Sequence, residues 1–167
     1  MAAGPTYESI ATTTLGSAAS SITFSSIPNT YTDLRLVLVG RNDSNGNIFT
    51  RLNSDSNSNY SQTNLIGNGS AASSTNQTSQ SIWYLTLGQT TSTTIPFMYT
   101  LDIFNYAGST NKTALITQSA DQNGSGAVMR SVALYRSTSA ISTILFYVNA
   151  MNFTSGFTAT LYGIKAA

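Results

Sequence analysis

Apolar residues recur at every second position of this chain, in short runs that turn residues separate. Residues 34–39 read LRLVLV, and residues 158–164 read TATLYGI. Because successive side chains of a β-strand point to opposite faces of a sheet, a period of two indicates a strand with one buried face. No stretch of the sequence combines a helix cap with a sustained period of 3.6. The pattern therefore predicts an all-β fold.

Further runs rich in β-branched and aromatic residues are also predicted to be strands. They cover residues 21–25, 48–52, 60–66, 80–87, 96–106, 113–119, 128–136 and 142–148. About ten short strands with Gly- and Asn-rich turns between them are typical of an antiparallel β-sandwich. The length favours a jelly roll of two four-stranded sheets with extra strands at the edges, and an immunoglobulin-type sandwich is the alternative.

A mass of 17.7 kDa fits a single domain over residues 1–167. The stretch Gly67–Ser79 reads GNGSAASSTNQTS, and we predict a surface loop there, because a linker would leave two halves too small for separate sandwiches. Residues 1–5 carry no positive charge ahead of an apolar run, so no secretory signal is expected. The apolar run at 144–148 is too short to span a bilayer, and no membrane insertion is expected.

Charged residues make up 8% of the chain, and histidine and cysteine are absent. Enzymes draw nearly all their acids, bases and nucleophiles from titratable side chains. Without histidine, a hydrolase would need a Ser–Lys pair, and the two lysines lie at Lys112, near a turn, and at Lys165, near the end. We therefore expect no catalytic site, no cofactor and no metal. The net charge of +1 is spread along the chain, which argues against a nucleic-acid partner.

The acidic residues are scattered rather than paired as in a glycosidase. Asp33 and Asp102 are predicted to be ion-pair or turn partners for arginines. Residues 55–59 read DSNSN, like the start of a calcium loop, but positions 60 and 66 hold Tyr and Ile instead of the required Gly and Glu. An Asx-rich turn is the favoured interpretation, although ion binding stays open. Residues 43–47, DSNGN, are predicted to form a hairpin turn.

Two kinds of surface contact are predicted from aromatic and arginine positions. Trp83 and Tyr84, with Tyr60 and Tyr99, are candidates for a sugar-stacking platform, and ordinary core packing is the alternative. Because Trp83 and Tyr84 are adjacent, they must point to opposite faces, so at most one of them lies in the core.

The basic residues Arg130 and Arg136 are an even number of positions apart, so they are predicted to share a face of one strand. Arginine is enriched at protein interfaces, and this pair is a candidate subunit contact.

Several segments together resemble a family of small β-rich structural proteins of tailed bacteriophages, frequent in viruses of aquatic bacteria. These segments are YESIATTTLGS at 7–17, ITFSSIP at 22–28, YTDLRL at 31–36, LNSD at 52–55, NYS at 59–61, LYRSTSAI at 134–141 and FTATLYGIK at 157–165. The resemblance covers nearly the whole chain but rests on strand and turn signatures. It implies a virion structural protein, assembled in the host cytoplasm.

Two functions follow from this resemblance. The first is a capsid decoration or cement protein on the head exterior, bound to the major capsid protein and present as a homo-oligomer, with a trimer favoured. The second is a tail-fibre or receptor-binding tip that recognises a host surface glycan. A free polysaccharide-degrading enzyme is a distant third.

Overall fold

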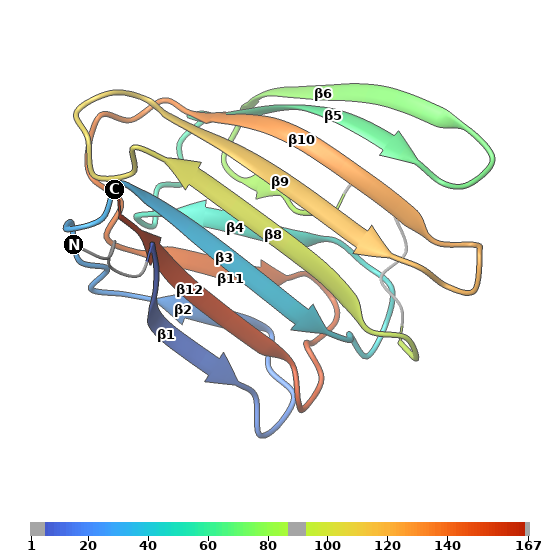
Figure 1. The fold of residues 1–167 in the computed structure, drawn as a ribbon. Coiled ribbons are helices and arrows are strands. Elements are labelled where there is room, and N and C mark those ends of the chain that lie inside the picture. Colours follow the sequence, from blue (N-terminus) through green and yellow to red (C-terminus); the bar gives the residue numbers. More distant parts are fainter. Residues whose placement is uncertain (1–5, 87–92, 166–167) are drawn as a thin grey trace.

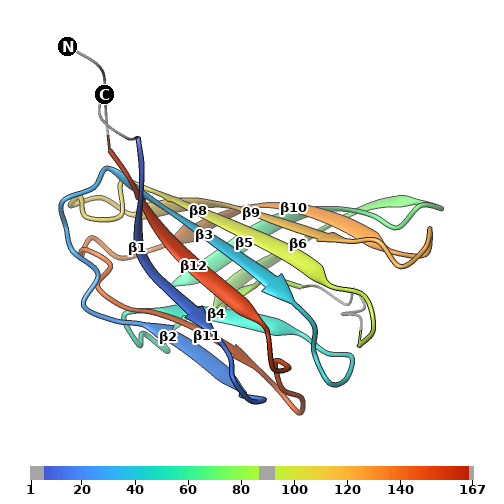
Figure 2. The ribbon, with the colours of Figure 1, turned by 60° about the horizontal axis from the view of Figure 1, so that its bottom comes forward.

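The computed structural model describes residues 6–86 and 93–165. They form two antiparallel sheets packed face to face, as Figures 1 and 2 show. The predicted all-β antiparallel sandwich of the jelly-roll type is confirmed. Within these residues, no helix has the length and apolar character needed to cross a membrane.

Among the described residues the sheets contain eight and four strands, so the extra strands expected at the edges of two four-stranded sheets all lie in one sheet. The larger sheet has the order β1 (Tyr7–Thr14), β12 (Thr158–Ile164), β3 (Asp33–Gly40), β8 (Phe97–Phe104), β9 (Lys112–Ala120), β10 (Ala127–Tyr135), β5 (Tyr60–Gly67) and β6 (Ala72–Gln80). The smaller sheet has the order β2 (Ser21–Phe24), β11 (Ile144–Val148), β4 (Ile48–Leu52) and β7 (Trp83–Tyr84). Hairpin connections at residues 105–111 and 121–126 keep β8, β9 and β10 in one sheet, and β5 and β6 extend it further.

The period of two is realised as an inner and an outer face. In β3, Leu34, Leu36 and Leu38 are fully buried, while Arg35 and Val37 lie on the outer face and are half-buried. The inner faces of both sheets contribute to a single hydrophobic core. Burial of such large side chains is the main stabilising contribution to a sandwich of this size.

The segment Gly67–Ser79 is not a surface loop, and that prediction was wrong. Its first residue ends β5, residues 68–71 form a hairpin turn, and Ala72 begins the nine-residue strand β6. Ser, Thr, Asn and Gln have modest strand propensity, and the composition of the segment therefore suggested a loop. Pairing with β5 supplies the hydrogen bonds that hold the segment extended.

Two other expectations need correction, and one strand was missed. A strand was predicted at 80–87, of which the structure describes residues 80–86. Within this range, β7 has only two residues. Residues 43–47 are not a hairpin turn, because β3 and β4 belong to different sheets and neither Asn45 nor Gly46 has a positive φ. Strand β1 was not predicted, since its apolar alternation is weak.

The larger sheet extends past the smaller one. In Figure 2 the ends of β5, β6, β9 and β10 project beyond β2, β11 and β4. The side chains of β6 are accordingly exposed on both of its faces, apart from two that are half-buried.

Candidate functional site

An apolar patch lies on the outer face of the larger sheet, on β5 and β10. Leu65 is 60% exposed, Val128 54% and Val132 53%. Arg130 lies directly opposite Leu65 and is also exposed. A shallow hollow of ≈ 220 Å³ lies against Leu65, Val128 and Arg130, and it is smaller than the roughly 300–1,000 Å³ of a typical small-molecule pocket.

Charge within this outer apolar patch comes from Arg130 alone. Among the ion pairs of the described residues, none involves this arginine. Leu65, Val128 and Val132 surround it with aliphatic surface, so a partner that covers the patch would also remove the guanidinium from water. Contiguous exposed apolar patches mark interaction sites, and arginine is enriched at protein interfaces.

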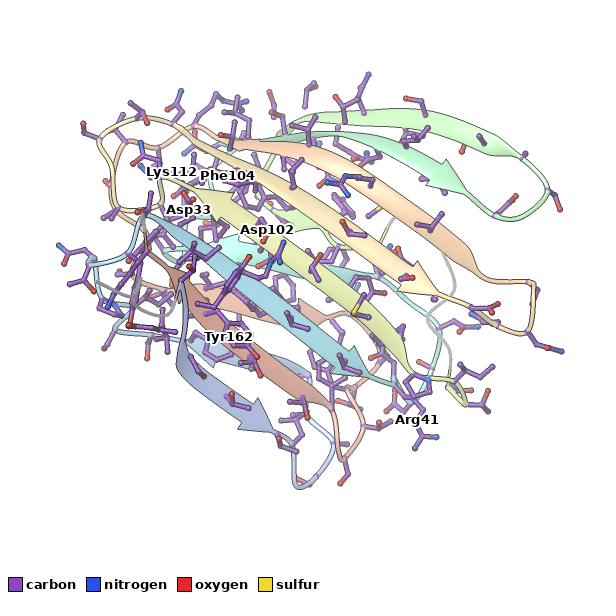
Figure 3. The ribbon with its side chains drawn as sticks, viewed as in Figure 1. Asp33, Arg41, Asp102, Phe104, Lys112 and Tyr162 are labelled. Atoms are coloured by element: carbon purple, nitrogen blue, oxygen red, sulfur yellow. The ribbon has the colours of Figure 1, made fainter. Side chains whose placement is uncertain are left out.

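A second feature of the same face is the ion pair between Arg35 and Asp102, whose residues lie opposite each other on β3 and β8. The guanidinium binds both carboxylate oxygens, with Nε–Oδ1 at 2.5 Å and Nη2–Oδ2 at 2.8 Å. The hydrogen bond to Asp102 raises the pKa of Arg35. Figure 3 shows Asp102 and Tyr162 on this face of the sheet. The carboxylate is thereby engaged, and Asp102 is confirmed as an ion-pair partner rather than a free base.

Tyrosines flank this ion pair at the β1 edge of the sheet. The guanidinium of Arg35 lies 5.7 Å from the ring centroid of Tyr7, and the ring of Tyr7 meets that of Tyr162 edge to face at 6.4 Å. Asp33 has a different role, because its Oδ1 accepts a hydrogen bond from the backbone N–H of Asn105 at 2.7 Å. It is therefore a turn partner for a backbone amide and not for an arginine.

The predicted sugar platform of Trp83, Tyr84, Tyr60 and Tyr99 is not formed at the surface. Trp83, Tyr60 and Tyr99 are fully buried, and the ring of Trp83 meets that of Tyr60 edge to face at 5.7 Å. The indole Nε1 donates to the carbonyl of Leu134 at 3.1 Å. These three aromatic side chains therefore belong to the core.

Tyr84 lies on the outer face of the smaller sheet, opposite in direction to Trp83. Its ring meets Phe49 at 5.3 Å between centroids, and Phe49 meets Tyr147 at 5.3 Å. The guanidinium of Arg51 lies 5.5 Å from the ring centroid of Tyr147. Phe49, Tyr84, Tyr147 and Arg51 form a half-buried aromatic row, which sequence reasoning found only through Tyr84.

The two arginines proposed as a contact pair have separate surroundings. Arg130 points outward from β10, within the outer apolar patch. The predicted shared strand face is not formed, because β10 ends at Tyr135. Arg136 lies beyond the end of β10, and its guanidinium donates a hydrogen bond to the carbonyl of Ser58. Arg136 therefore holds the loop between β4 and β5, and the structure does not bring it into the patch.

The carboxylate of Asp55, in the loop at 55–59, is fully engaged in hydrogen bonds. Asp55 accepts hydrogen bonds from the backbone and side-chain nitrogens of Asn57, from Nδ2 of Asn59, and from the hydroxyl of Tyr135. Burial would raise the pKa of Asp55, but these hydrogen bonds outweigh it and hold the pKa below its ordinary value. The Asx-rich turn is confirmed. In the described ranges, no group of three or more His, Cys, Asp or Glu side chains is placed to hold a metal.

Lys112 is the one lysine placed inside the described fold rather than at its surface. Its Nζ donates hydrogen bonds to the carbonyls of Gly108 and Thr110 in the loop between β8 and β9. Burial lowers its pKa. Neither of these partners is a nucleophile, so the arrangement stabilises a loop and offers no Ser–Lys pair.

Some buried polar atoms on the inner face of the larger sheet have no hydrogen-bond partner in the described structure. They are the hydroxyls of Tyr99 and Ser131 and both amide atoms of Gln118, on the neighbouring strands β8, β10 and β9. Gln62 and Asn64 on β5, by contrast, are hydrogen-bonded to each other at 2.7 Å. An unpaired buried polar group destabilises the fold.

Comparison with protein-family models finds no match. Comparison with curated proteins finds none either. Among solved structures, the galectin LEC-6 of Caenorhabditis elegans matches with a TM-score of 0.40 and 10% sequence identity, over 93% of this chain and 96% of that one. A similarity this low says nothing about the ligand of the present chain.

Proposed function

We propose that this chain is a structural protein of a bacteriophage virion that decorates the exterior of the head. The outer apolar patch of Leu65, Val128, Val132 and Arg130 carries the proposal, because it offers a docking surface for another protein. The sequence resemblance to phage structural proteins supplies the biological setting. In this setting the partner is the major capsid protein, and the chain acts as a homo-oligomer without enzymatic activity.

The chemistry of the surface agrees with this role. The protein is poor in charge, with 8% charged residues, and its polar side chains are mainly the hydroxyls and amides of Ser, Thr, Asn and Gln. Salt screens charges but has less effect on such groups, so the solubility of the particle depends little on ionic strength. The absence of cysteine makes the fold independent of the redox state of its surroundings.

The test is to count the protein in purified phage particles by quantitative mass spectrometry. A decoration protein is expected at a copy number comparable with that of the major capsid protein. A number comparable with that of tail proteins would contradict the head location. Absence from the particle would contradict the virion role altogether.

Binding of the purified protein to heads that lack it tests the docking surface. Val132→Thr combined with Leu65→Thr is expected to weaken binding, because both substitutions remove exposed apolar surface at the patch. Val39→Thr is the matched control, since Val39 is 42% exposed on the outer face of β3, outside the patch. Equal binding by all three proteins would overturn the assignment of the surface.

The alternative function, a tail tip that recognises a host glycan, is favoured by the aromatic row of Phe49, Tyr84 and Tyr147 with Arg51. Aromatic faces pack well against the apolar faces of sugars, and an arginine can donate to hydroxyls. A glycan array probed with the protein and with Tyr84→Ala tests it. Binding that is lost in the variant would support this function over decoration, and an array without signal would oppose it.

A further inference from the structure

The outermost strand of the larger sheet, β6, has a neighbour on one side only. It pairs with β5 along its length, and the sheet order ends there. The strand is nine residues long and contains no charged residue and no proline. Long neutral edge strands present unpaired N–H and C=O groups and readily accept another strand.

The other sheet edges in the described structure are protected. At the opposite edge, β1 has an irregular register between Ser9 and Ala11, and its Glu8 is ion-paired with Lys165 at 2.6 Å. Bulges and charges of this kind oppose edge pairing. The smaller sheet ends in β2, of four residues, and β7, of two. Of these edges, β6 alone is both long and neutral.

We propose that β6 pairs antiparallel with β6 of a second copy of this chain, about a two-fold axis perpendicular to the sheet. In such an interface the strand meets a copy of itself, so like charges at mutually facing positions would repel each other. The side chains of β6 are Ala, Ser, Thr, Asn and Gln. Hydroxyls and amides both donate and accept hydrogen bonds, so these side chains can bond to the same side chains of a second copy. This self-complementarity selects a second copy over a charged partner.

The geometry of β6 limits the contact to its first six residues. The register with β5 shifts between Tyr60 and Gln62, and Ser79 has a φ of 54°, so the strand bends near its end. An axis through Thr75 would place Ser74 opposite Asn76 of the partner copy, with both side chains on the outer face. Figure 1 shows β6 at the margin of the larger sheet, with no described strand beyond it.

The described residues form one long, neutral edge per copy, so pairing through it ends at two copies. The structure therefore favours a dimer over the trimer that the sequence resemblance implied. This inference goes beyond the virion role and does not depend on it, because β6 would pair in the purified protein whether or not it binds a phage head.

Sedimentation equilibrium of the purified full-length chain over a wide concentration range tests the proposal. The unmodified protein is expected to show a monomer–dimer equilibrium. Ser74→Lys with Asn76→Lys is expected to raise the dissociation constant at least about tenfold, because lysines of the two copies face each other. The matched control is Thr12→Lys with Thr14→Lys on the exposed outer face of β1, which should leave the equilibrium unchanged.

A mixture of two variants with opposite charges tests whether β6 of one copy contacts β6 of the other. Ser74→Glu with Asn76→Glu should also be monomeric alone, and mixing it with the lysine variant should restore a dimer. Thermal unfolding of each variant checks that it is folded.

Three results would overturn the proposal. The first is an unmodified protein that stays monomeric at all concentrations, and the second is a lysine variant that dimerises like the unmodified chain. The third is a trimer, or a dimer lost in the β1 control instead. None of these results bears on the copy number in phage particles, so failure here and failure of the virion role are distinguishable.

Discussion

The ring of Tyr31 packs directly on Gly163, so closely that a Cβ at position 163 would lie 2.3 Å from the ring Cγ. The ring is fixed from the other side as well. Its hydroxyl donates to Oε2 of Glu8 at 3.1 Å, and the ammonium of Lys165 lies 5.8 Å from its centroid. Gly163 thus allows one tyrosine to connect β12, β1 and the loop before β3.

Gly163→Ala is expected to lower the free energy of unfolding by about 1–3 kcal/mol, because the tyrosine held by Glu8 and Lys165 must move. Urea unfolding at neutral pH measures the change. Gly16→Ala is the matched control, since a Cβ there meets no atom within 4 Å, and a shift within about 0.5 kcal/mol is expected. Equal losses for the two variants would show that the contact between Tyr31 and Gly163 is unimportant.

Two glutamines on the inner face of the larger sheet should respond oppositely to the same change. Both amide atoms of Gln118 are buried without a partner. The amide of Gln62 donates to Asn64 and to the carbonyl of Tyr84, and its oxygen accepts from the N–H of Tyr84 at 2.7 Å. Methionine keeps the length of the side chain and removes its polar atoms.

Gln118→Met is therefore expected to raise the free energy of unfolding by about 1 kcal/mol, whereas Gln62→Met should lower it by about 2 kcal/mol. Chemical unfolding of both variants under identical conditions gives the comparison. A loss of stability in Gln118→Met would mean that its amide is hydrogen-bonded in solution, to ordered water for instance.

Strands were predictable from the sequence where apolar and polar residues alternate within the strand itself. The alternation of β3 between a face of buried leucines and an outer face follows from the period of two. Strand β6 was missed because its extended form depends on pairing with β5, which is a tertiary effect that composition does not reveal. The distribution of strands between sheets failed for the same reason, since the connections between β3, β4 and β5 change sheets.

The candidate surfaces were harder to predict than the fold. Parity places Trp83 and Tyr84 on opposite faces but does not say which face is buried, and the larger ring proved to be the core residue. Leu65, Val128 and Val132 are exposed, but in the sequence they look like ordinary strand residues. The identity of an apolar residue does not show whether its side chain is buried or exposed. Their exposure could have been inferred from the neighbouring residues Ile66 and Met129. Adjacent residues of a strand point to opposite faces, and these two are buried.

Acid should weaken the loop at 55–59. The pKa of Asp55 is lowered in the folded protein, so its contribution to stability is fully present above the unfolded value of about 4. It is lost as the pH falls through the folded value. The difference in unfolding free energy between the unmodified protein and Asp55→Asn is therefore expected to be largest near pH 7 and to shrink toward pH 2. A difference independent of pH would contradict a role for the charged carboxylate.

Alkali should unfold the protein through its buried tyrosines. Burial raises the pKa of Tyr60, Tyr99, Tyr106 and Tyr135 above the ordinary value of 10.0. Because the unfolded chain releases these protons first, the stabilising contribution is complete below about pH 10 and is lost as the pH rises toward the folded values. We expect the free energy of unfolding to fall steeply between pH 9.5 and about pH 12.

Tyr99→Phe isolates one of these groups. Its hydroxyl is buried and has no hydrogen-bond partner among the described residues, so the substitution should be neutral or stabilising at pH 7. Above pH 10 the variant should lose less stability than the unmodified protein, since phenylalanine has no proton to release. Urea unfolding at pH 7, 9.5, 10.5 and 11.5 measures both effects. Parallel pH profiles for the two proteins would show that Tyr99 ionises as easily in the folded chain as in the unfolded one.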